Sequence, residues 1–238
     1  MNKIGYLHRF MMTIMLFTLL SAGGTVKGTI RYEGKIPRLK NFDMTIESVC
    51  LMKHEKDPAN YPARSEALVL GEGNTMANIF VRISGGLTKK EWEPPKEPEV
   101  LNQDGCTYSP HVLALMLGQP LKFLNSDGVL HNLHAFPLEN DEFNVTMPKF
   151  IKETIREFEY SEGMFPIKCD VHPWMGGFIA VMEHPFFDVT GKDGVYKINN
   201  LEPGTYTLEA WHEKLGTQSA EVTITGDKTQ TIDFVFKR

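Results

Sequence analysis

Residues 169–175 read CDVHPWM, which places a thiol, an imidazole and a thioether at three-residue intervals, on Cys169, His172 and Met175. A short segment with this spacing can present all three side chains to one metal ion. Soft sulfur ligands combined with imidazole favour copper, and two imidazoles, one thiolate and a weak axial thioether form the electron-transfer type of copper site. The segment therefore predicts a copper site that lacks one histidine.

A second imidazole is available upstream, in the run DGVLHNLH at 127–134. This run follows the apolar segment 121–124, which predicts a strand. His131 completes a ligand set of His131, Cys169, His172 and Met175 for one type 1 copper ion. His134 is its competitor, but residues three apart on a strand point to opposite faces, so only one of the two can face the metal.

Most of the chain predicts short strands separated by Gly, Pro and Asn, so we expect an all-β protein. Alternating strands are expected at 205–211 and 220–224, and long apolar strands at 112–117 and 121–124. Two short windows, 64–68 and 87–92, are predicted as helices because Leu and charged residues cluster in them.

A proline-rich stretch divides the chain. Residues 91–98 read EWEPPKEP, which favours an extended, solvated linker. The apolar strands that follow end at HP, residues 184–185, so 99–184 are predicted to form one unit. The flanks, 24–98 and 185–238, hold two strands before the insert and about four after it. We predict that together they build one discontinuous β-sandwich, because insertion at a loop tip leaves the host core intact.

The N-terminal residues carry a targeting pattern. Basic residues precede an apolar run at 10–20, and small residues follow at 21–24. Residues 1–23 therefore predict a secretory signal peptide and a periplasmic or secreted protein. The apolar run is short of the roughly 20 residues that span a bilayer, so a membrane contact is expected only if this segment stays uncleaved as an anchor.

Charge and cysteine usage narrow the function classes. The chain of 238 residues has a formal net charge of −5, and without residues 1–23 it has 23 basic and 30 acidic residues, or −7. An acidic chain without a basic stripe disfavours nucleic acid as a partner. Three cysteines in an exported chain leave one over. Cys50 and Cys106 are expected to pair as a disulfide while Cys169 binds metal; the rival is a second metal site using Cys50 with His54, or Cys106 with His111.

Two families resemble parts of this sequence. The opening GTVKGTI at 24–30 and the run LEPGTYTL at 201–208 resemble the carboxypeptidase regulatory-like, transthyretin-like β-sandwich. Residues 105–182, with SPHV at 109–112, GQPL at 118–121, NSD at 125–127 and the 169–175 loop, resemble a cupredoxin, and the loop itself resembles that of amicyanin. The amicyanin-like pattern His-Asn-x-His-x-Phe favours His131 over His134 as the ligand.

The cupredoxin resemblance implies further roles. Asn132 would hydrogen-bond across to the ligand loop and orient the metal ligands. His172 would protrude through an apolar patch and pass electrons to partners, with Pro173 and Trp174 in the docking surface. The expected partners are redox proteins such as cytochromes or a copper/haem oxidoreductase.

Other residues are expected to be structural. His111 is expected to pack or cap near the start of a strand, and His54, His184 and His212 to be surface or structural residues. Met147 and Met164 are expected to pack, and Glu139, Asp141 and Glu142 to form a solvated loop. No His-x-x-Glu zinc motif occurs, which disfavours carboxypeptidase activity, and no Cys-x-x-Cys-His motif for covalent haem occurs. The leading interpretation is a protein that shuttles single electrons and is not an enzyme by itself. A copper carrier or sensor, and an envelope protein stapled by copper, are the alternative functions.

Overall fold

The computed structural model describes residues 23–56, 63–88 and 90–238. These residues form an all-β protein with one α-helix, and no helix within them is long and apolar enough to span a membrane. The predicted signal peptide lies, apart from residue 23, outside the described residues.

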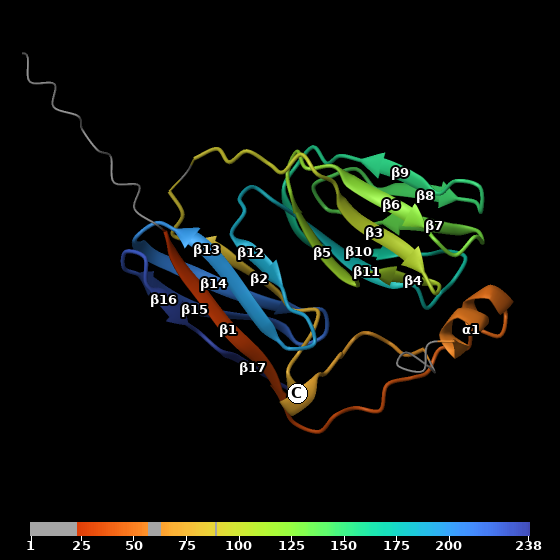
Figure 1. Ribbon diagram of the computed structural model, residues 1–238, viewed down its shortest axis with the longest axis horizontal. Helices are drawn as coiled ribbons and strands as arrows, with labels where there is room; N and C mark the ends of the chain where they lie inside the picture. Colours follow the sequence, from red (N-terminus) through yellow and green to blue (C-terminus); the bar gives the residue numbers. More distant parts are fainter. Residues whose placement is uncertain (1–22, 57–62, 89) are drawn as a thin grey trace, which may run out of the picture.

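Two four-stranded sheets form the first unit (Figure 1). In one sheet, β1 (Gly24–Glu33) pairs antiparallel with β13 (Val195–Leu201) and parallel with β16 (Thr229–Thr231) and β17 (Phe234–Lys237). The other has the order β12 (Phe187–Val189), β2 (Phe80–Gly85), β14 (Gly204–His212), β15 (Gly216–Ile224). Alternate residues of β1 face the core, where Val26, Ile30 and Tyr32 are buried, as a period of two requires.

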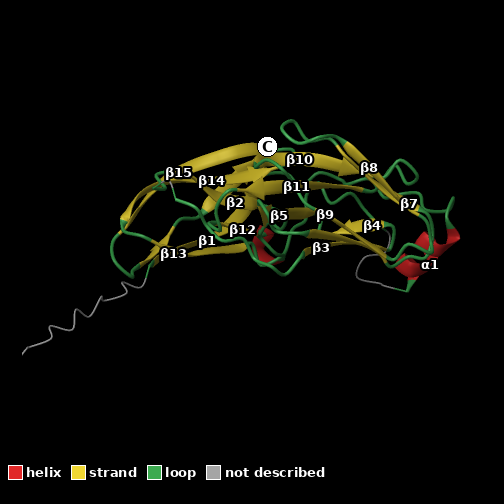
Figure 2. Ribbon diagram, turned by 90° about the horizontal axis from the view of Figure 1, so that it is seen from above, coloured by secondary structure: helices red, strands yellow, loops and turns green. Residues whose placement is uncertain are grey.

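The second unit is also built from two sheets. One has the order β5 (Val112–Met116), β11 (Gly176–Met182), β10 (Glu162–Lys168), β7 (His131–Ala135), β8 (Phe143–Met147). The other has the order β4 (Thr107–Ser109), β3 (Glu99–Asp104), β6 (Leu121–Asn125), β9 (Glu153–Arg156). All of its strands lie between β2 and β12, so the second unit is inserted into the first along the chain. Figure 2 shows the two units side by side.

The two units share a small apolar interface. Every residue of β5 is buried, because Leu113 and Leu115 face the core of the second unit while Val112 and Ala114 face the first. On the other side of the interface lie Phe80 of β2 and its neighbours. Strands covered on both faces appear in sequence as continuous apolar runs, which is why 112–117 lacks alternation.

A polar contact reinforces this interface. His111 is buried at the start of β5 and lies 3.1 Å from the Glu213 carboxylate of the first unit, while its Nδ1 lies 3.0 Å from the Gly176 carbonyl. Burial opposes the charged imidazolium, but the Glu213 hydrogen bond and nearby Glu66 outweigh it and raise the pKa of His111. Burial likewise opposes the Glu213 carboxylate, and the bond to His111 lowers its pKa overall.

This pair predicts a pH-dependent stability. Because the pKa of His111 is raised on folding, its contribution is complete below about pH 6.5 and is lost as pH rises through the folded pKa. Because the pKa of Glu213 is lowered, its contribution is complete above about pH 4.5 and is lost as pH falls through the folded value. We expect His111→Gln to cost on the order of 1 kcal/mol more at pH 6 than at pH 8.5. Urea unfolding at both pH values measures this; equal losses would rule it out.

The helix lies elsewhere than the sequence predicts. Segment 64–68 is not helical, since Arg64 forms an isolated bridge with Asn41, and the described residues of 87–92 form no helix either. Both helix predictions are therefore wrong. The α-helix is α1 (Ser48–Glu55), which the Glu47 side chain caps by accepting the Val49 N–H. The capping explains where α1 begins, but its weak apolar pattern gave no sequence signal.

The segment that carries α1 packs against the inserted unit. From the end of β1 the chain runs to the far end of that unit and then back to the first unit (Figure 1). Met44, Cys50 and Ala63 belong to the hydrophobic core of the inserted unit. Part of the range 24–98, predicted as sandwich, thus contributes to the other core. We call residues 41–56 the lid, because this segment, which carries α1, lies over the far end of the inserted unit.

Candidate metal centre

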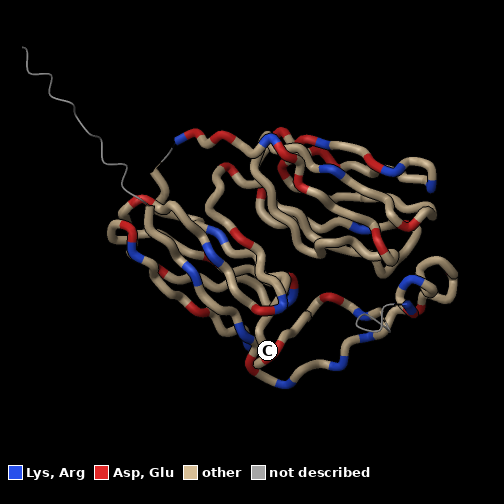
Figure 3. The backbone as a smooth tube through the Cα atoms, in the orientation of Figure 1, with Lys and Arg blue, Asp and Glu red and all other residues tan. Residues whose placement is uncertain are grey.

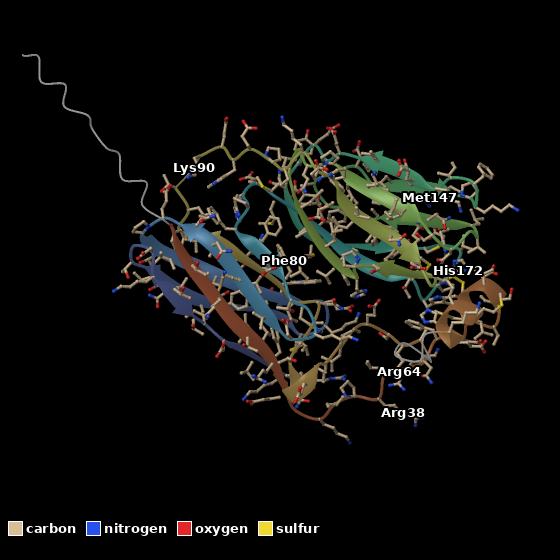
Figure 4. All side chains as sticks on the ribbon, in the orientation of Figure 1. Arg38, Arg64, Phe80, Lys90, Met147 and His172 are labelled. Atoms are coloured by element: carbon tan, nitrogen blue, oxygen red, sulfur yellow. A yellow bond between two sulfur atoms is a disulfide. The ribbon has the colours of Figure 1, made fainter. Side chains whose placement is uncertain are left out.

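The predicted ligands meet at one end of the inserted unit. His131 is the first residue of β7, and Cys169, His172 and Met175 lie in the loop between β10 and β11. Two backbone hydrogen bonds close this loop, from the Cys169 N–H to the Met175 carbonyl at 3.1 Å and from the Met175 N–H to the His172 carbonyl at 2.9 Å. The loop is thereby fixed in a tight turn, and Figure 4 shows His172 beside α1.

Three of the predicted ligands are in direct contact. The Nδ1 atoms of His131 and His172 are 3.0 Å apart, and Cys169 Sγ lies 3.8 Å from His172 Nδ1. One ligand atom from each of the three residues lies within 4.8 Å of the others. All three are buried, with at most 2 % of each residue exposed. Met175 is buried in the same core cluster as Cys169, and its role as axial ligand remains a prediction.

The donor set suits copper. His131 Nε2 lies 2.8 Å from a carboxylate oxygen of Asp127, which can only accept, so Nε2 carries a proton and Nδ1 is the nitrogen that would bind a metal. Burial opposes the charged ring, but the bonds to Asp127 and Cys169 outweigh it and raise the pKa of His131, so a metal would displace the Nδ1 proton. Burial and the neighbouring His131 lower the pKa of His172, which favours the neutral imidazole that metals bind. Burial would raise the pKa of the Cys169 thiol, but hydrogen bonds from His131 and backbone groups lower it overall. Thiolate and neutral imidazoles together fit copper.

Asp127 is a residue of the site that the sequence analysis missed. Its side chain is fully buried and accepts hydrogen bonds from the N–H groups of Gly105 and Cys106, at 2.7 and 2.9 Å. It also pairs with Lys53 of α1 at 2.7 Å. Burial opposes its charge, but the bonds from His131 and Lys53 outweigh burial and lower its pKa to about 2. An acid four residues before the histidine was the only sequence signal.

Asn132 holds the ligand loop against β7. Its Oδ1 accepts the Asp170 N–H at 2.8 Å and the Cys169 thiol at 3.3 Å, which is the cross-loop bond that the resemblance implies. Its Nδ2 donates to Asn144 and to the Asp170 carboxylate. The Tyr108 hydroxyl donates to the Asn132 carbonyl at 2.6 Å. Asn132 therefore holds Cys169 and Asp170 of the ligand loop against β7.

The expected exposure of His172 is wrong in this structure. His172 is 2 % exposed, and its Nε2 lies 3.9 Å from Cys50 Sγ of α1. Cys50 is joined to Cys106 by a disulfide, so the lid is bonded to the inserted unit. Figure 2 shows α1 at that end, next to β4 and β7.

The proposed docking residues differ in exposure. Pro173 is exposed, but Trp174 is half-buried. The Trp174 indole N–H donates to the Cys106 carbonyl at 3.0 Å, and its ring centroid lies 5.2 Å from that of His172. Trp174 therefore packs beneath the lid and presents only part of its surface. Its role in docking stays a proposal.

The remaining candidates lie outside the ligand cluster. His134 bonds to Asp170 and Glu142 and packs on Phe136, with ring centroids 4.2 Å apart. His54 is buried and lies 2.6 Å from the Gly105 carbonyl, and His212 is buried beneath Phe236. The buried Met147 accepts a hydrogen bond from Gln103.

Charge is mixed over both units. Figure 3 shows Lys and Arg interspersed with Asp and Glu along the chain. Glu139, Asp141 and Glu142 are exposed in the segment before β8, which fits a solvated loop.

Comparisons with known proteins agree with this architecture in part. Residues 185–237 match the carboxypeptidase regulatory-like domain family. No curated protein matches the chain. Similar solved structures include the copper-containing nitrite reductase NirK of Thermus scotoductus, with 22% identity and a TM-score of 0.34 over 41% of this chain and 25% of the reductase. Thus the chain spans about a quarter of that reductase.

Two smaller proteins are matched over almost their whole length. The P94A mutant of amicyanin has 20% identity and a TM-score of 0.33, over 41% of this chain and 97% of amicyanin. A purple cupredoxin from Nitrosopumilus maritimus has 23% identity and a TM-score of 0.30, over 35% of this chain and 98% of the cupredoxin. The described residues thus form an all-β protein in which 185–237 match the carboxypeptidase regulatory-like family, and part of the chain is similar to solved cupredoxins.

Proposed function

We propose that this is an exported copper protein that passes single electrons between redox partners. One observation carries the proposal: the buried contact of His131, Cys169 and His172, two of whose imidazole nitrogens face each other at 3.0 Å. Without a metal, a proton on one of these nitrogens would be donated to the other, and a bound metal ion would replace that proton. Bound copper would supply the one-electron redox couple, and Met175 would contribute a weak thioether ligand.

The surroundings of the cluster suit electron transfer better than copper delivery. The ligands are buried, and Asp127, Asn132 and the closed loop fix three of them from outside. Fixed ligands reduce the rearrangement that accompanies a change of oxidation state. A carrier must release its ion, which the lid and the buried ligands oppose.

The disulfide supports export. Disulfides form and persist in oxidising compartments, and Cys50–Cys106 agrees with the signal peptide predicted at 1–23. We propose a periplasmic or secreted location, with cytochromes or copper/haem oxidoreductases as partners. We propose that the chain has no enzyme activity of its own.

Spectroscopy of the full chain loaded with Cu(II) tests the proposal. We expect an intense thiolate-to-copper band in the visible region and a narrow copper hyperfine splitting, because the thiolate of Cys169 would be a strong ligand in the equatorial plane. A chelator that removes the copper should remove both signals. A colourless protein at one copper per chain, or one with the wide splitting of nitrogen and oxygen ligands, would refute the assignment.

A further inference from the structure

The lid lies against the His172 side of the ligand cluster. His172 directs Nδ1 to the cluster and Nε2 to the sulfur of Cys50. Cys50 and Cys106 are both fully buried against this imidazole. A redox partner that approached this end would contact α1 and not His172 (Figure 4).

Besides the disulfide, the lid is held by the packing of Phe42, Met44 and Leu51 on the core of the inserted unit and by polar contacts. Lys53 pairs with Asp104 at 2.5 Å and with Asp127 at 2.7 Å, at a position where its side chain is 34 % exposed. His54 lies 2.6 Å from the Gly105 carbonyl. Within α1 the buried residues are Cys50 and His54. A helix of eight residues is marginal by itself, so its position depends on these anchors.

The residues of the inserted unit that hold the lid include Asp127 and two residues that bond to it. Gly105 and Cys106 donate their N–H groups to Asp127, which in turn orients His131. Gly105 and Cys106 thus both hold the lid and, through Asp127, help to orient His131.

We propose that residues 41–56 form a gate over the electron-exchange edge of His172, and that the Cys50–Cys106 disulfide is the latch that keeps the gate shut. The proposal rests on the function proposed above. A dithiol reductant opens the latch: one of its thiolates attacks a latch sulfur, its second thiol displaces the resulting mixed disulfide, and the reductant leaves as a disulfide. Two electrons and two protons pass to the protein, which gains the thiols of Cys50 and Cys106.

Because both sulfurs of the disulfide are buried, α1 must open before a reductant can attack them. A thiolate cannot reach Cys50 or Cys106 in the closed form, so attack requires transient local opening of α1. Once the bond is broken, the lid keeps its polar anchors and its apolar packing but loses its covalent link, and the open state becomes more populated.

The first test needs no copper. The full-length chain with Cys50→Ala and Cys106→Ala is compared with wild type for carbethoxylation of His172 by diethyl pyrocarbonate, read peptide by peptide by mass spectrometry. We expect the rate at His172 to rise roughly tenfold or more. His134, which lies on the outer side of β7, serves as the internal reference and should not change. Met52→Ala, on the exposed side of α1, is the matched control with the latch intact.

The second test uses copper-loaded protein. Electron exchange with hexacyanoferrate is followed by stopped flow for the double variant and for Met52→Ala. We expect the rate to rise several-fold in the double variant alone. Unchanged modification of His172 would overturn the gate, and so would a modified His172 with an unchanged or slower exchange rate. If the double variant does not fold, wild type treated with dithiothreitol and then alkylated is measured in its place.

These two tests distinguish failure of the copper assignment from failure of the gate. A chain that binds no copper would still show the change in His172 modification if the lid opens. A blue protein with no change in modification would retain the proposed function and lose the gate.

Discussion

Replacement of Cys169 by serine is expected to abolish the visible absorption of the copper-loaded protein. The band arises from charge transfer between thiolate and copper, and within the described residues Cys169 is the cysteine that is free of a disulfide. Serine is nearly the same size and can still bond to Asn132, so the loop should keep its shape. The measurement is the visible spectrum at one copper per chain.

Replacement of His131 should also abolish the visible absorption, here because an imidazole ligand is lost. His131→Ala takes away one of the two imidazoles that face each other at 3.0 Å, and with it the strong thiolate band. His134→Ala is the matched control, because His134 bonds to Asp170 and Glu142 outside the cluster and its loss should leave the band intact. A band that survived in His131→Ala would refute the ligand assignment. A band that survived in Cys169→Ser would refute the assignment of the thiolate, because Cys50 and Cys106 are joined in a disulfide.

Asp127→Asn should weaken copper binding by about 10- to 100-fold, the usual cost of losing a residue that orients a metal-binding histidine. The amide keeps the size of the side chain but removes the buried charge that fixes the proton on His131 Nε2. It also weakens the pairing with Lys53. Competition with a chelator of known affinity measures the loss.

Asp104→Asn is the matched control for this effect. Asp104 also pairs with Lys53, but it is exposed, and the carboxylate that pairs with His131 is that of Asp127. We expect its copper affinity to stay within about twofold of wild type, in keeping with the small worth of exposed ion pairs. Equal affinities for Asp127→Asn and wild type would show that Asp127 only supports the fold. Thermal unfolding of the copper-free variants separates these two roles.

The all-β architecture could be predicted because the strands carry local signals. The period of two in β14 and β15, and the apolar runs of β5 and β6, were recognisable before their partners were known. The α-helix α1 could not be predicted from a local signal of this kind. α1 has a weak apolar pattern and is held by a disulfide and ion pairs to residues about 50 positions away.

In the candidate site, too, some residues could be predicted from local sequence and others could not. Three predicted ligands lie within seven residues, so their spacing alone suggested a common metal. Asp127 was missed because a carboxylate near a histidine is common in sequences, and only the folded chain shows that its side chain is buried between His131 and Lys53.

The sequence by itself predicted a donor set suited to copper and determined the strand-rich fold and the order of the two units, because ligand softness and side-chain periodicity are local properties. The tertiary structure alone decided that His172 is covered and that Asp127 faces His131. It also decided that a segment leaving the first unit closes over the second. Burial and long-range contacts depend on which distant segments pack together, and no short stretch of sequence specifies that packing.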